Sequence, residues 1–507
     1  MSPPVVSDVV AAVPKKPVPS LPQEKNLDDY VNDFLKSSPA EPPCPDALAP
    51  SVAALRLLSR MRAWKRVEVL AKQLIDDHSS ATSTTIDKNI LEDIQLYYFV
   101  ALFKLGRPPF IDLQRDLASF LNNHLQSQQH SNFNLKNKFI ISLRLLQIEL
   151  FQYAETLPIA GGNGGPPGAG TGVGGTGNGM ENKNLPKCID ELRLLRKDLD
   201  IEFNQQENNE NNEEQDARYL LWWRRITMSI VNVAVRTGNW RVALTSLDEL
   251  LKKIQFKSSH EFQTLGYQIE IYSRIGKIFL QMGNLEEASN YFEFAKQTDI
   301  QRASLILTMN SHDNQDDGTK NKECVTSPRI LLNTGLLAFA HNHFKAASEL
   351  FHQVIEFEKK RSHNKTFSFD HHSTSSSTTI STTQQQGGGG NEGGGDFVES
   401  IMIIPTSPED LLSTAFFGID IEENLMIEAI NNFSICTMYM CNLTYAVSIL
   451  ESLICDDPTS NMSEVVVFNL CTMYELTCDN EVTNRRKRVL QKVAAKFCLH
   501  DISLLSF

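Results

Sequence analysis

The sequence has few of the features that mark membrane proteins and nucleic-acid-binding proteins. No run approaches the roughly 18 apolar residues that span a bilayer, and the first residues lack a basic start followed by an apolar core. Positive charge is in deficit, since the net charge is -13, whereas nucleic acids and anionic membranes attract basic surfaces. These absences predict a soluble cytoplasmic protein, and they argue against nucleic acid and anionic membranes as direct partners.

Cysteine pairs with metal-ligand spacing are also missing. Of the nine cysteines, those near the C-terminus are Cys436, Cys441, Cys455, Cys471, Cys478 and Cys498, and no two of them stand in a C-x-x-C arrangement. Free cysteine is among the most buried residue types in globular proteins. The pattern predicts small apolar fillers in packed helices and no metal site.

Signatures of catalysis are absent or incomplete. A glycine tract satisfies G-x-G-x-x-G at 170–175, but no strand precedes it. The DNQDDG stretch at 313–318 imitates a calcium loop and then has Cys324 where a bidentate glutamate is required. An H-E-x-x-H motif begins at His260 and fails at Thr264. No G-x-S-x-G, Walker or kinase signature is present, so the sequence predicts no enzyme, no catalytic residue and no cofactor.

Polar and glycine-rich stretches divide the chain into helical parts and linkers. Segments with too few apolar residues to bury a core are expected to be linkers or disordered. The expected organisation is a disordered Pro-rich N-terminus at 1–50, an N-terminal helical region of atypical repeats at 51–157, Gly-rich and acidic Asn-rich linkers around a short helix at 158–216, repeats at 217–309, a polar insertion at 310–327, a repeat at 328–360, a disordered Ser/Thr/Gln/Gly insertion at 361–400 and C-terminal repeats at 401–507. Within the N-terminus, residues 27–35 are a candidate docking helix with Tyr30, Val31 and Phe34 on its apolar face.

The parts between the linkers have a helical period. Apolar residues recur at spacings of three and four, and alternating strand patterns are nearly absent. In residues 272–299, Gly283 separates two helices, and Gly276 and Ala288 are small where the helices cross. This arrangement is typical of the tetratricopeptide unit of about 34 residues. The predicted fold class is all-α, a tetratricopeptide-repeat superhelical solenoid.

One such unit cannot bury its apolar face alone, so the pattern predicts neighbouring units. Matching small or turn residues occur at Gly238, Ala243, Gly335, Ala347, Ala446 and Pro458, the last at the expected end of a unit. A degenerate pair, VVVFNLCTMYEL followed by RRKRVLQKVAAKF, lies near the C-terminus. A solenoid presents an extended surface, which favours protein binding over catalysis.

Chaperone co-adaptors are an alternative class of tetratricopeptide protein. Their domains hold a C-terminal carboxylate with Lys and Asn side chains on the first helices of the units. The corresponding positions here carry Met228, Asn232, Arg274, Arg329 and Asn333. Met228 offers no donor to a carboxylate, so the clamp is incomplete.

A basic run at 485–488 permits two interpretations. Such a run serves either as a nuclear signal or as the exposed face of a helix. The second interpretation is favoured because Val489, Leu490 and Val493 would turn toward a core on the same helix.

The most specific signal lies in three segments, INNFSICTMYMCNLTYAVSILESLICDDP, SEVVVFNLCTMYEL and RIGKIFLQMGNLEEASNYF, with WWRR before the first clear unit. Together they resemble the family of the twelfth subunit of the transport protein particle, TRAPP, over about 217–309, 328–357 and 425–478.

The resemblance implies a non-catalytic scaffold subunit of a multisubunit vesicle-tethering complex in endoplasmic reticulum to Golgi transport. It implies other complex subunits as direct partners and an early-secretory Rab GTPase as an indirect one. It also implies a peripheral location at the endoplasmic reticulum-Golgi intermediate compartment or Golgi. A mitotic or kinetochore-associated scaffold is a lesser alternative from the same family.

The last helices predict a docking surface. Apolar residues lie on nearly every face of 465–476, and a helix of this kind needs cover on both sides. We expect a partner subunit to complete the cover, with Phe468, Met473 and Tyr474 as contact residues. The alternative is that residues 483–507 fold back over the helix and cover it entirely.

Overall fold

A computed structural model of the chain describes residues 26–36, 38, 50–80, 88–106, 110–127, 138–151, 184–206, 213–257, 261–311, 327–369, 425–499 and 501–502. Within these ranges every regular element is a helix, which confirms the predicted all-α class. In chain order they are α1 (Leu27–Phe34), α2 (Val52–Arg60), α3 (Trp64–Ser80), α4 (Lys88–Leu105), α5 (Phe110–Ser127), α6 (Lys138–Phe151), α7 (Asn184–Gln206), α8 (Glu213–Arg236), α9 (Trp240–Lys257), α10 (Glu261–Gln281), α11 (Leu285–Ser311), α12 (Pro328–Ala340), α13 (Phe344–Phe369), α15 (Met426–Tyr439), α16 (Leu443–Asp456), α17 (Pro458–Asn461), α18 (Glu464–Thr477) and α19 (Asn480–Lys496).

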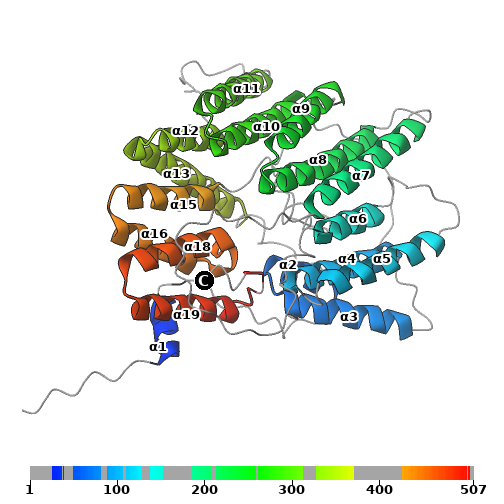
Figure 1. The fold of residues 1–507 in the computed structure, drawn as a ribbon, viewed down its shortest axis with the longest axis horizontal. Coiled ribbons are helices and arrows are strands. Elements are labelled where there is room, and N and C mark those ends of the chain that lie inside the picture. The colour runs from blue at the N-terminus through cyan, green and yellow to red at the C-terminus, as the bar shows by residue number, and fades with distance from the viewer. Residues whose placement is uncertain are drawn as a thin grey trace, which may run out of the picture.

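The helices pack as consecutive pairs. The pairs α8–α9, α10–α11, α12–α13, α15–α16 and α18–α19 each form across a short turn, and α9 packs on α10, α11 on α12, α13 on α15 and α16 on α18. Each pair therefore buries its apolar face against its neighbours, as a repeat array requires. Figure 1 shows the helices following an arc from α2 and α3 through α8–α11 to α19. The chain is the tetratricopeptide-type solenoid that the sequence predicts.

One turn geometry recurs along this array. A residue in the left-handed region follows the first helix at Arg62 (φ 56°), Gly238 (φ 68°), Gly283 (φ 76°), Asn342 (φ 62°) and Cys441 (φ 63°), and Cys498 (φ 60°) repeats it after α19. The next N–H then bonds a carbonyl five residues earlier, as from Asn284 N to Phe279 O at 2.9 Å. This Schellman arrangement satisfies the carbonyls that a helix end leaves open. The α2–α3 pair has the same turn as the central units although it lacks a glycine there.

We expect Cys441→Gly to stabilise the protein. A left-handed conformation strains a residue with a Cβ by about 1–2 kcal/mol, and the greater freedom of glycine in the unfolded chain offsets part of that gain. The net gain in the free energy of unfolding should be about 0.5–1 kcal/mol. Gly283→Ala is the matched reverse change and should lower stability. Thermal unfolding of both variants tests the pair, and a shift of the same sign in both would contradict it.

Helix crossings depend on complementary side-chain sizes. A Cβ added at Gly276 would lie 2.4 Å from Phe292 Cε1, and one at Gly335 would lie 2.6 Å from Phe351 Cε1. The ring fills the space that each glycine leaves, which keeps the interior closely packed. The small residues Ala243, Ala288, Ala347 and Ala446 each begin the buried face of a second helix and are fully buried. Pro458 is buried as the first residue of α17, just after α16 ends.

The two ends of the solenoid meet. Arg62, in the turn between α2 and α3, donates from Nη1 to Met462 O at 2.9 Å and to Thr459 O at 3.1 Å. Its Nε donates to Asp501 Oδ2 at 2.9 Å, and its Nη2 lies 2.7 Å from Asp501 Oδ1. Cys498 also packs against the core that begins at α2. The arc in Figure 1 is thus closed by contacts between its first and last helices.

Two predicted boundaries are wrong. The helix expected to be short between the linkers of 158–216 is α7, which has 23 residues, and α8 already begins at Glu213. The insertion expected from 361 begins with helix, because α13 continues to Phe369. A polar composition lowers the apolar burial of a segment without preventing a helix from extending into it.

Several sequence predictions lie outside the described residues. They concern the Pro-rich residues 1–25, the glycine tract at 170–175, the DNQDDG stretch at 313–318, His260 and residues 370–424. Among the residues that are described, no helix has both the length and the apolar composition to cross a membrane. The same residues contain no group of three or more His, Cys, Asp or Glu side chains arranged to hold a metal ion.

Candidate protein-binding surface

Helix α18 has one covered face and one open face. Val466, Val467, Leu470, Met473 and Tyr474 are buried against α16 and α19 in a single core. On the other side, Val465, Phe468 and Leu476 expose 61%, 59% and 62% of their surface. These three residues follow helical spacings of three and eight, so they form one stripe, called here the α18 stripe. An open apolar stripe on a helix whose other face is covered is typical of a protein contact.

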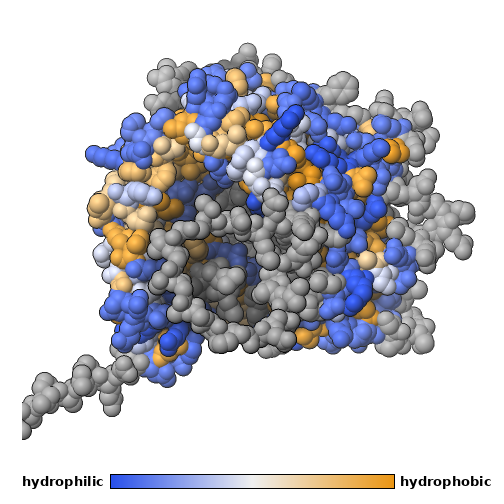
Figure 2. Space-filling model, viewed as in Figure 1, coloured by the Kyte–Doolittle hydropathy of each residue, from blue (hydrophilic) through white to orange (hydrophobic). Residues whose placement is uncertain are grey.

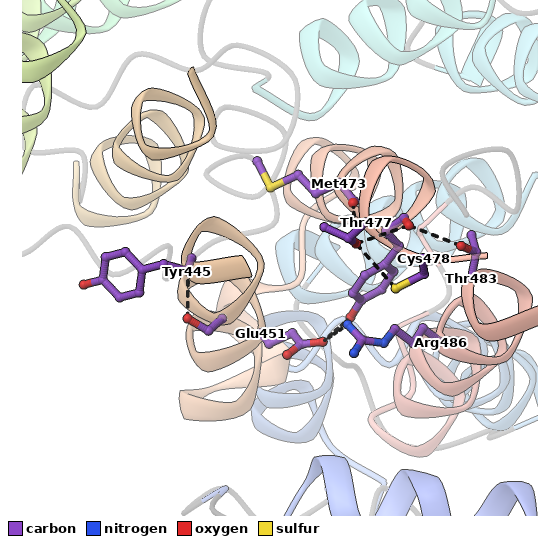
Figure 3. A network of polar contacts seen from close by, with 9 residues as sticks. Tyr445, Glu451, Met473, Thr477, Cys478, Thr483 and Arg486 are labelled. Carbon is purple, nitrogen blue, oxygen red and sulfur yellow. Dashed lines mark hydrogen bonds and ion pairs between the residues drawn. The ribbon is translucent and has the colours of Figure 1, made fainter. Parts of the chain in front are cut away.

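Tyr474 and Met473 are internal, which corrects their prediction as contact residues. The Tyr474 hydroxyl donates to Glu451 Oε1 at 2.7 Å, and the Arg486 guanidinium lies 5.0 Å from the tyrosine ring centre. Burial and the neighbouring Glu451 carboxylate raise the pKa of Tyr474. Figure 3 shows Glu451 of α16 and Arg486 of α19 pointing toward one another in this network. Tyr474 and Met473 therefore lie inside the packing of α16, α18 and α19 and are not free to bind a partner.

The chain itself covers part of the apolar surface of α18 that was predicted to contact a partner. Helix α19 folds back on α18 through Val489, Leu490 and Val493, which are buried in the same core. The described part of the predicted fold-back segment 483–507, which is α19 and the residues up to Ile502, packs on this one face. The α18 stripe stays open because Phe468 turns away from that core.

Polar contacts join the first helices of different units in this half of the chain. Asn469, the neighbour of Phe468, donates from Nδ2 to Asn431 Oδ1 of α15 at 2.8 Å. Lys277 of α10 donates to Glu428 Oε1 of α15 at 2.7 Å. Burial raises the pKa of Glu428, but Lys277 and Arg329 outweigh it, so that pKa lies below its usual value. The ion pair and the amide contact thus link α10 and α18 to α15.

Three of the five positions of the chaperone co-adaptor clamp are buried within the chain. Arg329 is buried, with Nε 3.0 Å from Glu270 Oε2 and Nη1 3.9 Å from Glu428 Oε2. Asn333 is buried and donates from Nδ2 to Ser273 Oγ at 2.7 Å. Met228 is fully buried and apolar. At Arg329 an incoming carboxylate would meet Glu270 and Glu428, and like charges repel.

A second exposed apolar group was not anticipated from the sequence. Phe339, Phe344 and Tyr439 form an aromatic cluster, in which the rings of Phe344 and Tyr439 stack at 4.8 Å between their centroids. Tyr439 exposes 53% and the nearby Tyr445 exposes 51% of its surface. Figure 3 shows Tyr445 pointing away from the buried network, and Figure 2 shows hydrophobic residues gathered over α12, α15 and α16. The repeat pattern does not predict this exposed aromatic group, because its residues lie beside the turns between helices.

The basic run at 485–488 is largely engaged within the chain. Arg485 lies over the ring of Tyr30, Arg486 over that of Tyr474, and Lys487 donates to Glu475 Oε1 at 2.6 Å. The run is thus neither a free signal nor a simple solvent-facing surface. Tyr30 belongs to α1, the predicted docking helix. This helix therefore packs against the C-terminal end of the solenoid.

The buried cysteines among the described residues have the character of packing residues. Cys436, Cys455 and Cys471 are buried, and burial raises the pKa of each thiol to about 11. Thiols with raised pKa values hold little thiolate at neutral pH and react slowly. Cys441 is exposed at a turn.

Comparison with known proteins gives two curated relatives. The chain is 19% identical over 464 residues to trafficking protein particle complex subunit 12 of Homo sapiens, covering 89% of this chain and 47% of that protein. It is 22% identical over 284 residues to the Mus musculus subunit of the same name, covering 56% of this chain and 24% of that protein. The chain therefore spans less than half the length of each relative. This is distant similarity to a TRAPP subunit.

Other comparisons add little to this result. No family model matches the chain. Among solved structures, the apo form of RapI aligns with a TM-score of 0.32 at 9% identity, over 92% of this chain and 87% of RapI. A signal transduction ATPase with a tetratricopeptide repeat sensor from Pyrococcus horikoshii aligns with a TM-score of 0.16 at 12% identity, over 93% and 72% of the two chains. The assignment of the fold rests on the recurring turns and helix pairs described above.

Proposed function

We propose that this chain is a non-catalytic scaffold subunit of a TRAPP-like tethering complex. The observation that carries the proposal is the similarity to subunit 12 of the human particle over 89% of the chain. The closed solenoid supports it, because such arrays hold other proteins on extended surfaces. In this role the direct partners are other subunits of the complex, and an early-secretory Rab GTPase is contacted only through them.

The proposed setting is transport from the endoplasmic reticulum to the Golgi. The chain would be cytoplasmic and peripheral at the intermediate compartment or the Golgi, and partner subunits would supply its contact with membrane. Nucleotide exchange on the Rab would belong to other subunits. Acceleration of GDP release from a Rab by the isolated chain would contradict the non-catalytic role.

The α18 stripe is the proposed docking surface for a neighbouring subunit. Its three residues are apolar, equally exposed and in one row, whereas the opposite face of the helix is already buried. Binding would remove the stripe from water, which is the main source of affinity in such contacts. Phe468 is the expected centre, because large aromatic residues carry much of the energy of protein interfaces.

Phe468→Glu should detach the chain from its complex. A charge at the centre of an apolar contact is buried without a partner, so recovery of other subunits should fall about tenfold or more. Stability should change little, since Phe468 is largely exposed. The measurement is affinity purification of the tagged full-length chain, with quantitative mass spectrometry of the co-purified proteins.

Leu194→Glu on α7 is the matched control, because Leu194 is exposed to a similar degree at 55%. It should leave recovery unchanged. Two failures can be told apart in this experiment. Absence of tethering-complex subunits from the wild-type sample would contradict the proposed function, whereas full recovery with a folded Phe468→Glu chain would contradict only the docking surface.

A further inference from the structure

Helix α1 binds across the C-terminal end of the solenoid with an amphipathic pattern. Val31 is buried in the core that α16, α18 and α19 share. Leu27, Tyr30, Phe34 and Leu35 pack against the same core and are half-buried, while the residues between them are exposed. Apolar residues at these spacings lie on one side of a helix. The contact is thus the packing of an amphipathic helix into a groove.

One ion pair and one tyrosine contact join α1 to α19. Its polar face carries Asp28, Asp29 and Asp33, and it lies on α19, which carries the basic run and Lys492. The Lys492 ammonium pairs with Asp28. Arg485 donates from Nη1 to Tyr30 Oη at 2.9 Å, and its guanidinium lies 5.1 Å from the centre of the same ring. These contacts recognise an acidic amphipathic helix with an aromatic residue at its centre.

The length of α1 shows that the groove holds its structure. The helix has 8 residues, and isolated helices shorter than about 12–15 residues are marginal in water. Within it, Asn26 N donates to Asp29 Oδ2 at 3.1 Å, which caps one end. At the other end, Phe34 O accepts a bond from Cys455 Sγ of α16 at 3.1 Å. Such a segment folds when it binds, as short peptide ligands do.

We propose that α16 and α19 form a binding groove for a short acidic amphipathic helix, and that residues 27–35 of this chain are its resident, exchangeable ligand. Only Val31 of α1 is buried, so the contact is small compared with the cores of the helix pairs. Its occupancy comes from being tethered, which gives α1 a local concentration on the order of 1 mM at the groove. Release of α1 exposes Arg485 and the apolar groove together, and a helix of the same chemistry can then occupy it.

A labelled peptide of residues 24–36 tests this proposal by fluorescence anisotropy. The full-length Val31→Arg chain should bind the peptide at least about tenfold more tightly than the wild-type chain, because arginine cannot enter the core and its charge is repelled by α19. A peptide carrying Val31→Arg should not bind either chain. Binding of equal affinity to both chains, or to neither, would overturn the proposal. Loss of cooperative unfolding in the Val31→Arg chain would show that α1 is a fixed part of the core and would overturn it as well.

A charge exchange locates the bound peptide in the groove. Lys492→Glu, added to the Val31→Arg chain, should weaken binding of the wild-type peptide and strengthen binding of a peptide with Asp28→Lys. An unchanged preference would place the peptide elsewhere and contradict the proposal. Co-purification of two differently tagged wild-type chains that is lost when both carry Val31→Arg would show that α1 is supplied by a second copy, and would overturn the assignment to the same chain. Neither experiment depends on the proposed tethering function.

Discussion

Arg62→Ala is expected to open the solenoid where its two ends meet. The substitution removes the donors of Thr459 O and Met462 O and leaves the half-buried Asp501 carboxylate without its bidentate partner. Loss of one member of a buried ion pair costs about 3–5 kcal/mol, and partial exposure of this pair places the expected loss near the lower value, about 3 kcal/mol. Relative to the wild type, hydrogen exchange in the variant should accelerate more in α2, α17 and the residues after α19 than in α10 and α11.

The position of Arg62 in the left-handed region supplies a second comparison. Arg62→Gly removes the same side chain but accepts φ 56° without strain, so it should be about 1 kcal/mol more stable than Arg62→Ala. Arg62→Lys keeps the charge and loses the bidentate geometry, so the stability of this variant should lie between that of Arg62→Ala and that of the wild type. Equal hydrogen exchange in the wild type and all three variants would show that the ends do not depend on this contact.

The contact between Arg62 and Asp501 also affects the pKa of Lys104. Burial lowers the pKa of the Lys104 ammonium, Asp501 opposes that effect, and Arg62 lowers the pKa further. Removing Arg62 takes away a like charge, so the pKa of Lys104 should rise and its ammonium should offset part of the lost positive charge beside Asp501. This compensation adds to the partial exposure of the pair in keeping the expected loss near the lower end of the range.

The sequence predicts the repeat array because its signals are local. Gly283 and Ala288 are separated by five residues, and the turn between them is made by backbone bonds within ten residues. Close helix crossings carry a similar local signal, since Gly276 and Phe292 lie on consecutive helices. Such patterns repeat along the chain and can be recognised without knowing how the units curve.

The contacts between distant ends have no comparable signal. Arg62 and Asp501 are separated by 439 positions, and their meeting depends on the summed curvature of every unit between them. Residues 27–35 could be recognised as an amphipathic helix, but the groove that binds them is formed only after α16 and α19 pack. The sequence therefore gives the ligand helix and leaves its site undetermined.

The two faces of α18 show a further limit. Both faces are apolar, so the helical period alone does not tell which side is covered. The structure places Tyr474 inside through its bond to Glu451 and leaves Phe468 outside. Only the packing of α16 and α19 decides between them, and this is why one of the three predicted contact residues remains a candidate. The α18 stripe and α1 are thus separate surfaces at the same end of the solenoid.

Gly276→Leu is expected to destabilise the central units strongly. Even a Cβ at this position would lie 2.4 Å from Phe292 Cε1 and 2.5 Å from Cδ1, and Phe292 is itself buried. A leucine must push this ring or the whole helix α11 aside, and overpacking of this kind costs about 1–3 kcal/mol. Gly276→Ala should cost less, because alanine favours the helix by about 1 kcal/mol relative to glycine.

The compensating change identifies the cause. Phe292→Ala alone leaves a cavity and should cost about 3–5 kcal/mol, but it also makes room beside residue 276. The loss in the free energy of unfolding of the double variant Gly276→Leu, Phe292→Ala should therefore be smaller, by at least about 1 kcal/mol, than the two single losses added together. Urea unfolding measures all four chains, and Gly335→Leu with Phe351→Ala is the equivalent set in the next unit. Strict additivity in both sets would show that the glycines do not serve to admit these rings, and would remove the steric account of how the helix pairs approach.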